Sequence, residues 1–441
     1  MWCRVLVAIS AYVFSVARAQ SSWDDVRKVL QKGVDDRVYP GAVALVGNED
    51  GVLFQAAVGT LTYGQKTPTG GANEAMTVSG TRFDMASCTK VLSTTSAVAL
   101  LFQKGAFGQM GLETKVGSLL DGFGVNGKET ITIENCLLHN TGFPPDPTPN
   151  FWEPTFGCAG APLPSSMNFD CSEKAFQAIK TQALRPGATV GGKFVYSDLS
   201  FLTLMHVVGH VAFTNKYVTV ADFLPQCSRT IPMGPGLQNQ CAYEAFVRTH
   251  IFSKLGMKNT QFLPPKPDWP SCAPTTIPTG EPKEVEGVAL QGRVEDGNAY
   301  MLGGIAGHAG LFSNVDDISS LLNELLFRNY IFNQTTVRTF TKQHNHSQSS
   351  RAYGWDTNDI TAIPDGNYGG CCGALSAKTF THTGYTGTQV CADPEKRIYT
   401  ILLTARVYNM SNTGNSKGIL SVRRSFGNAV AAVVDAKLLH K

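Results

Sequence analysis

Ser87-Cys88-Thr89-Lys90 is the stretch from which the fold and chemistry of this 441-residue chain are best read. A serine and a lysine three residues apart share one face of a helix, so the Ser87 hydroxyl and the Lys90 amine can meet there. A serine hydroxyl becomes a nucleophile when a neighbouring base takes its proton, and a lysine of lowered pKa can be that base. The spacing alone is common, and its plainer interpretation is two residues on a surface helix.

Two triplets further along the chain give this spacing its weight. Tyr196-Ser197-Asp198 and His382-Thr383-Gly384 follow it, in the order expected of an enzyme that uses a serine nucleophile with a lysine base. Together the three motifs resemble the serine β-lactamase and penicillin-binding-protein superfamily, in particular its class C-like branch, which also holds esterases and D-amino-acid peptidases. The resemblance runs from about Pro40 to Ala436. Its supporting stretches are Arg82–Ala86, Leu137–Gly142, Val294–Asp296, Gly307–Ser313 and Tyr385–Thr388.

The resemblance implies an α+β fold, an α/β sandwich in which helices flank an antiparallel sheet built from both chain ends. A mainly helical lobe is inserted between these ends, and the active site lies between the two lobes. We expect one catalytic domain over residues 20–441, after a signal peptide over residues 1–19. Within it, the sheet lobe would take about residues 20–86 and 345–441, and the helical lobe about residues 87–344.

The resemblance also assigns roles in catalysis. Ser87 would form the acyl-enzyme, with Lys90 as its base. Tyr196 would carry protons to the leaving group and activate the deacylating water, although a buried core tyrosine is the plainer interpretation. The backbone N–H groups of Ser87 and Tyr385 would form the oxyanion hole.

Two positions depart from the β-lactamase pattern. Asp198 stands where β-lactamases usually carry Asn, and a carboxylate only accepts hydrogen bonds whereas an amide also donates them. His382 stands where many relatives have Lys, and we expect it to donate a hydrogen bond to a substrate carboxylate or carbonyl, with a charge that depends on pH. Both residues occur in esterase-like members. We expect Asp198, His382, Thr383 and Gly384 to bind the substrate.

Other acidic and histidine residues near the motifs are assigned mainly structural roles. Asp296 is either an ion-pair partner or part of the cleft, and Glu295 replaces a histidine found in relatives, so its role is open. His139 and His308 are interpreted as structural. The chain has no C-x-x-C pair and its histidines are scattered, so a zinc site is the weaker alternative. No metal or organic cofactor is expected.

Apolar periodicity predicts the elements around these motifs. Helices are predicted over Trp23–Val34, Val91–Phe102, Tyr243–Leu255, Ile318–Leu326 and Ser421–Leu438. Strands are predicted over Ala42–Val46, Val52–Val58, Thr379–His382, Thr388–Ala392 and Ile398–Thr404, with a hairpin turn at Glu49-Asp50-Gly51.

The first residues resemble a targeting signal. Arg4 precedes an apolar run, and Ala17-Arg18-Ala19 fits a small-x-small cleavage site. A retained anchor is the alternative, but the run is short for a membrane span, and no later stretch is long and apolar enough. We therefore expect a secreted or extracytoplasmic protein, with a periplasm or lumen as alternatives.

The cysteines agree with an oxidising compartment. Of 11 cysteines, Cys3 leaves with the signal and an even number remains, which favours disulfides. Cys158–Cys171 and Cys227–Cys241 are the preferred pairs because each brackets a short loop. One of Cys371 and Cys372 is expected to pair elsewhere, with Cys391 or Cys272. Cys88 and Cys136 are expected to be buried thiols.

Charge and sequence motifs indicate which classes of partner and modification to expect. The net charge is +3, and no basic run suggests nucleic acid. Sequons at Asn333, Asn345 and Asn409 predict a glycoprotein if the source is eukaryotic. The sequence thus predicts a secreted serine hydrolase that cleaves small esters, D-amino-acid peptides and, weakly, β-lactams. The alternative is a ligand-binding or self-assembling scaffold on the same fold.

Overall fold

The computed structural model describes residues 23–158, 169–227, 233–275, 289–362, 370–408 and 416–438. The predicted signal peptide and the Asn409 sequon lie outside these residues. Among the residues that are described, no helix is long and apolar enough to cross a membrane.

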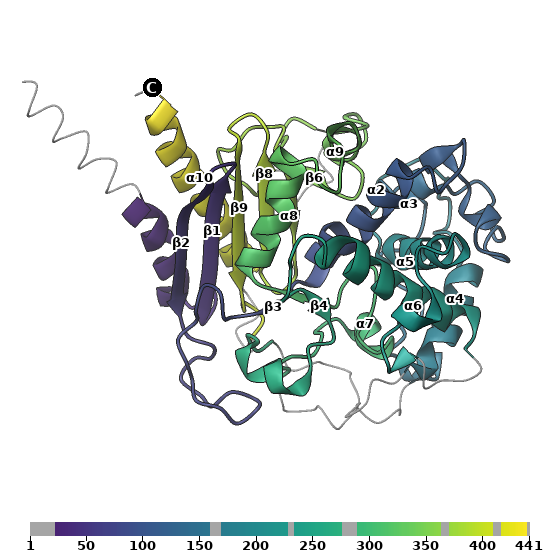
Figure 1. Ribbon diagram of the computed structural model, residues 1–441, viewed down its shortest axis with the longest axis horizontal. Helices are drawn as coiled ribbons and strands as arrows, with labels where there is room; N and C mark the ends of the chain where they lie inside the picture. Colours follow the sequence, from purple (N-terminus) through teal and green to yellow (C-terminus); the bar gives the residue numbers. More distant parts are fainter. Residues whose placement is uncertain are drawn as a thin grey trace, which may run out of the picture.

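A six-stranded antiparallel sheet joins the two ends of the chain, in the order β2-β1-β9-β8-β7-β6 (Figure 1). The N-terminal part supplies β1 (Gly41–Asn48) and β2 (Gly51–Gly59). The C-terminal part supplies β6 (Asp356–Thr357), β7 (Phe380–Thr383), β8 (Gln389–Asp393) and β9 (Ile398–Thr404). β1 pairs with β9, so the sheet joins residues more than 300 positions apart, as the sequence predicted.

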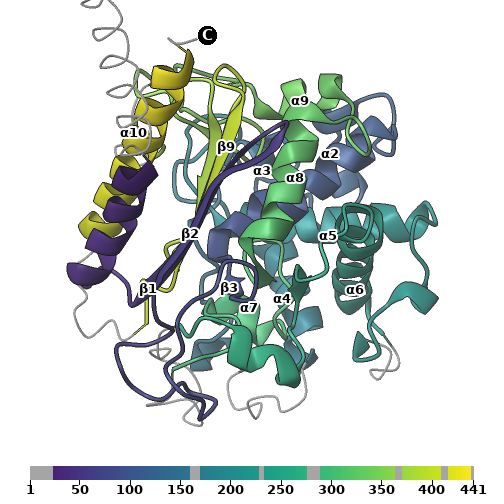
Figure 2. The ribbon, with the colours of Figure 1, turned by 60° about the vertical axis from the view of Figure 1, so that its left-hand side comes forward.

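Helices cover both faces of this sheet. The first helix, over residues 23–35, and α10 (Ser416–Leu438) lie on one face, and α8 (Val315–Phe327) lies on the other (Figures 1 and 2). Side chains alternate between the faces along each strand. Leu45 therefore belongs to the core beneath α8, whereas its neighbour Ala44 packs beneath α10 with Leu402 of β9.

The middle of the chain is mainly helical. Its helices are α2 (Ser96–Gln103), α3 (Ile133–Leu137), α4 (Asp170–Thr181), α5 (Asp198–Thr214), α6 (Pro235–Val247), α7 (Gly297–Met301) and α9 (Gln334–Thr341). Short 3-10 helices occupy Gly111–Glu113, Val116–Ser118, Pro154–Phe156, Val220–Asp222 and Lys266–Ser271. A small sheet of β3 (Phe83–Asp84), β5 (Leu311–Ser313) and β4 (Gln261–Phe262) links this region to the large sheet. Strand β3 of this small sheet leads directly into the serine motif, so the small sheet sets the position of Ser87.

The predicted elements are present with shifted ends. The last helix begins at Ser416, five residues before the predicted start, and the predicted helix at Tyr243 is the end of α6, which continues as a π-helical turn over Arg248–Phe252. The serine helix is irregular: a 3-10 turn over Ala86–Cys88 precedes a π-helical segment over Lys90–Thr95. Sequence periodicity cannot distinguish these turns from an α-helix, because the same side chains are buried in each.

Three disulfides are formed, including both preferred pairs. Cys158–Cys171 and Cys227–Cys241 are confirmed, and Cys372 pairs with Cys391. Cys88 and Cys136 are buried thiols as predicted, and so are Cys272 and Cys371.

The packing of β9 gives a stability prediction. Leu402 is fully buried between the sheet and α10, so Leu402→Ala should lower the free energy of unfolding by about 2–5 kcal/mol through lost contacts and a cavity. Val52→Ala in β2 is the control, because the Val52 side chain is 52% exposed. Urea denaturation of both variants checks this, and equal effects would contradict the described core.

Candidate active site

Ser87 lies where β3 meets the irregular helix. Ala86, directly before it, has φ +45°, a left-handed conformation that is uncommon outside glycine. The buried Asp84 carboxylate holds this bend, since it accepts the Ala86 N–H at 2.8 Å and the Glu295 N–H at 2.7 Å. Burial raises the pKa of Asp84 to about 6. Left-handed non-glycine residues and π-helical segments cluster at functional sites, and both flank Ser87.

Lys90 is the charged group at the centre of the site. Its side chain is fully buried, and Nζ donates to Ser87 Oγ at 3.0 Å and to the His308 carbonyl at 3.0 Å. Nζ also lies 2.7 Å from Asp198 Oδ1. Burial by itself lowers the pKa of Lys90, but the Asp198 carboxylate and the Tyr196 hydroxyl together outweigh burial and raise it. Lys90 is therefore an ammonium at neutral pH, and it must lose a proton before it can accept one from Ser87.

Tyr196 lies against both residues. Its hydroxyl hydrogen-bonds Ser87 and Lys90, and Lys90 Nζ lies 4.9 Å from the ring centroid. Burial raises the pKa of Tyr196, and the positive charge of Lys90 opposes that rise. Tyr196 is thus a neutral phenol in contact with the nucleophile and the ammonium, which is the geometry of a proton carrier.

The start of α5 fixes the tyrosine triplet. The Ser197 N–H donates to His139 Nδ1 at 3.1 Å, and the Ser197 hydroxyl donates to the Pro144 carbonyl at 2.6 Å. The Asp198 N–H donates to the Pro145 carbonyl at 2.7 Å. Burial lowers the pKa of His139 well below its usual range, so the ring is neutral and can accept from Ser197. The structural interpretation of His139 agrees with these contacts.

A second ion pair lies behind Lys90. His308 Nε2 is 2.9 Å from Asp296 Oδ1, and Asp296 also caps α7 by accepting the Ala299 N–H. Burial opposes ionisation of Asp296, but His308 outweighs it and lowers the Asp296 pKa to about 2. This pair positions the His308 carbonyl that accepts from Lys90. Asp296 is therefore an ion-pair partner, the first of the two alternatives.

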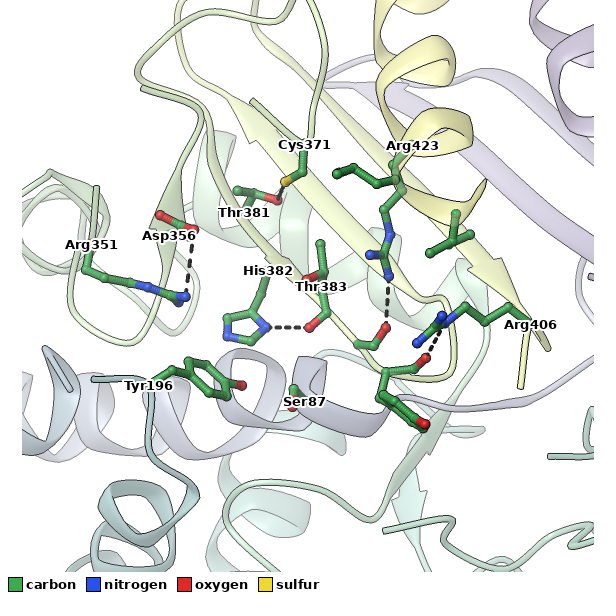
Figure 3. Close-up of a pocket in the computed structure, with 14 residues that line it drawn as sticks. Ser87, Tyr196, Arg351, Asp356, Cys371, Thr381, His382, Thr383, Arg406 and Arg423 are labelled. Carbon is green, nitrogen blue, oxygen red and sulfur yellow. Dashed lines mark hydrogen bonds and ion pairs between the residues drawn. The ribbon is translucent and has the colours of Figure 1, made fainter. Parts of the chain in front are cut away.

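A pocket of about 540 Å³ opens beside Ser87 (Figure 3). Of the residues predicted to form the site, its lining includes Ser87, Tyr196, His382, Thr383, Gly384 and Tyr385. Lys90 and Asp198 lie behind Ser87 and Tyr196. The structure thus brings together three motifs that are spread over almost 300 residues of sequence.

His382 has a different hydrogen-bonding role from the one expected. Its Nδ1 lies 2.8 Å from the Thr383 carbonyl, which only accepts, so Nδ1 carries the proton. Burial and the nearby charges of Arg351 and Lys90 lower the pKa of His382 well below its usual range. In the neutral ring Nε2 is then an acceptor, and it has no hydrogen-bond partner among the described residues. His382 is therefore suited to accept a hydrogen bond from a ligand, not to bind a carboxylate.

Sequence reasoning missed a second group of lining residues. These are Arg351, Asp356, Cys371, Arg406 and Arg423. They come from loops, from β6 and from α10, outside the three motifs. Arg423 could have been noticed, because it is a charged residue directly beside the apolar Val422 in the predicted last helix. However, nothing in the sequence placed this part of the helix at the pocket.

One cluster has the donor set of a metal site. Ligand atoms of Asp198, Asp296 and His308 lie within 4.8 Å of one another. However, Lys90 already contacts Asp198, and His308 already contacts Asp296. Within the described residues, these carboxylates therefore have cationic side chains as partners.

Comparison with known proteins identifies the family. The Beta-lactamase family model matches residues 26–423. The chain belongs to the β-lactamase family. Two bacterial relatives carry the name "Putative D-alanyl-D-alanine carboxypeptidase". The one from Escherichia coli (strain K12) is 27% identical over 352 residues, covering 75% of this chain and 70% of the relative. The one from Salmonella enteritidis PT4 is 26% identical over 398 residues, covering 85% and 80%.

Solved structures share the fold at low sequence identity. EstCE1, described as a hydrolase with promiscuous acyltransferase activity, has a TM-score of 0.62 at 18% identity, covering 93% of this chain and all of its own. The LovD6 mutant of simvastatin synthase from Aspergillus terreus has a TM-score of 0.62 at 16% identity, covering 93% and 94%. A class C β-lactamase from Rhodobacter sphaeroides has a TM-score of 0.60 at 16% identity, covering 93% and 99%. The chain is a β-lactamase-family hydrolase, and these solved structures share its fold.

The contact between Lys90 and Asp198 predicts a pH effect. Asp198 raises the Lys90 pKa, so Asp198→Asn should lower it, and the base form should then be populated at lower pH. The alkaline rise of kcat/KM should move down by about 1–3 pH units, the usual effect of one charge at this distance.

Asp435→Asn is the matched control, because Asp435 pairs with Lys396 at 2.5 Å far from the pocket. The pH–rate profile of each variant with a neutral p-nitrophenyl ester is the measurement. A profile that stays in place in Asp198→Asn would show that Asp198 does not control the protonation of the base.

Proposed function

We propose that this protein is a secreted serine hydrolase that forms an acyl-enzyme on Ser87 and cleaves an ester or an amide. The observation that carries the proposal is the contact of the Ser87 hydroxyl with both the Lys90 amine and the Tyr196 phenol at the wall of a pocket. A nucleophile beside two coupled proton-transfer groups is what acyl transfer requires.

In the proposed mechanism, Lys90 first gives up one proton to solvent. Ser87 Oγ then attacks the substrate carbonyl carbon, and the Ser87 proton passes to the Lys90–Tyr196 pair. Because the two groups contact each other, they titrate as one unit. Tyr196, which faces the pocket, then returns the proton to the leaving group. Water repeats the sequence to release the acyl group. The backbone N–H groups of Ser87 and Tyr385 stabilise the negative oxygen that forms at each addition step.

The pocket favours a particular kind of substrate. His382 Nε2 offers an acceptor within it, so an acyl group that donates a hydrogen bond there would satisfy a buried polar atom. The Asp198 carboxylate repels a substrate carboxylate and lacks the amide donor of an asparagine. We propose small neutral esters first, D-amino-acid peptides next and β-lactams last. The name of the bacterial relatives supports the peptidase class.

Secretion is supported by the cysteines. Three disulfides are formed, and disulfides persist in oxidising compartments. The side chains at two sequons, Asn333 and Asn345, are exposed, which permits glycosylation.

The proposal predicts that Ser87→Ala abolishes hydrolysis while the protein stays folded, because only one hydroxyl is lost. Turnover of p-nitrophenyl esters and labelling by a fluorophosphonate measure this, with Ser93→Ala, on the same helix, as the control. Retained turnover in clean Ser87→Ala protein would refute the mechanism. A wild-type protein that neither turns over substrate nor takes the label at Ser87 would favour the scaffold alternative.

The role proposed for Asp198 predicts a change of substrate preference. Asp198→Asn should raise the kcat/KM for a cephalosporin relative to that for a neutral p-nitrophenyl ester, because it removes a repelling carboxylate and adds a donor. The ratio of the two values, measured at the pH optimum of each protein, is the test. A ratio that is level or moves toward the ester would contradict this role.

A further inference from the structure

The turn that carries Tyr385 is tied to the segment that carries Ser87. This turn, over residues 384–388, connects β7 to β8. The Thr386 hydroxyl donates to the Asp84 carbonyl at 2.7 Å, and the Thr388 hydroxyl donates to the Met85 carbonyl at 3.0 Å. Both threonines are buried. The two backbone groups proposed for the oxyanion hole therefore sit on segments that side-chain hydrogen bonds hold together.

The turn needs glycine at its first position. A Cβ atom added at Gly384 would lie 2.1 Å from Thr388 Oγ1 and 2.6 Å from the Met85 carbonyl oxygen, so a larger residue would force the turn away from Ser87. The peptide group between Gly384 and Tyr385 lies directly at this close approach.

Arg423 holds that peptide group from the opposite side. The arginine is buried on α10, and its Nη2 donates to the Gly384 carbonyl at 2.8 Å and to the Thr388 carbonyl at 2.8 Å. Figure 3 shows Arg423 and Ser87 on opposite sides of the strand end marked by Thr383. The Gly387 N–H also donates to the Gly384 carbonyl, at 3.0 Å.

The direction of the carbonyl sets the direction of the N–H. A peptide group is planar and trans, so its C=O and N–H point in opposite directions. With the Gly384 carbonyl bonded to Arg423, the Tyr385 N–H points away from α10. If the peptide rotated, the carbonyl oxygen would replace the N–H, and a negative oxygen at the reacting centre would meet repulsion instead of a donor.

We propose that Arg423 is a positioning residue that keeps the Gly384–Tyr385 peptide oriented so that the Tyr385 N–H serves the oxyanion hole. This role rests on the proposed acyl transfer at Ser87. In that step a bond forms from Ser87 Oγ to the substrate carbonyl carbon, and the electron pair of the carbonyl π bond moves to its oxygen. In this role Arg423 acts through the peptide group and neither forms nor breaks a bond.

The test compares Arg423→Met, which removes the donors and keeps the length, with the wild-type protein and a neutral p-nitrophenyl ester. Removal of a whole oxyanion donor costs roughly 10²–10³ in kcat, so a donor that is misdirected part of the time should cost about 10- to 100-fold. KM should change by less than about twofold, because ground-state binding does not use the oxyanion hole. Arg424→Met, an exposed neighbour on the same helix, is the control.

A second readout separates positioning from a general loss of structure. The affinity for a neutral alkylboronic acid, which forms a tetrahedral anion on Ser87, should fall by the same factor as kcat/KM. Arg423→Lys keeps one donor and should recover part of the loss. If Arg423→Met does not fold, Arg423→Gln carries the same test with a polar side chain.

Two results would overturn the proposal. One is a folded Arg423→Met or Arg423→Gln protein with kcat within twofold of wild type. The other is a loss confined to the KM of substrates with a free carboxylate, which would make Arg423 a substrate-binding residue. If wild-type Ser87 is not acylated at all, the proposed function fails and the positioning role fails with it. Normal wild-type acylation with unaffected Arg423 variants defeats the positioning role alone.

Discussion

The structure of the site depends on one buried charge, the ammonium group of Lys90. A buried ammonium is costly unless it is paired and hydrogen-bonded. Here Asp198, the His308 carbonyl and Ser87 supply those partners, each from a different part of the chain. The Asp296–His308 pair and the contacts at the start of α5 hold two of these partners in place. The need to satisfy Lys90 therefore joins the serine segment, α5 and the 296–308 region into one unit.

Asp198 makes this site electrostatically distinct from one built with asparagine. A carboxylate stabilises the ammonium form, so Asp198 keeps Lys90 protonated. The deprotonated amine, once formed, is a stronger base, because basicity and pKa rise together. The Asp198 carboxylate therefore makes the deprotonated amine of Lys90 less abundant at neutral pH, and at the same time more basic.

Positive charge at the pocket comes from outside the third motif. His382 is neutral and accepts hydrogen bonds, so it does not replace the lysine that many relatives carry there. Arg351, Arg406 and Arg423 lie around the same pocket. Arg406 Nε donates to the Tyr385 carbonyl at 2.6 Å, and Arg423 donates to the carbonyls of Gly384 and Thr388. These two arginines contact the backbone of the turn, which places their charge behind the reacting centre.

The sequence by itself determined the family, the antiparallel sheet from both chain ends and two of the disulfides, and it predicted Ser87 as the nucleophile. The three motifs and the family resemblance that they carry implied the family and the sheet, and loop-bracketing cysteines indicated the disulfides. The shifted start of α10 and the π-helical turn after Ser87 were out of reach, because burial patterns do not report which hydrogen bonds close a turn.

Only the tertiary structure decided the protonation state of His382, the ion pair of Asp296 and the position of Arg423. Each depends on three-dimensional contacts: the His382 tautomer on the direction of the Thr383 carbonyl, and each pKa on charges and burial within a few ångströms. Arg423 is the clearest case. Its place in the sequence shows an arginine on an amphipathic helix, and only the packing of α10 against the β7–β8 turn shows that it holds a peptide group beside Ser87.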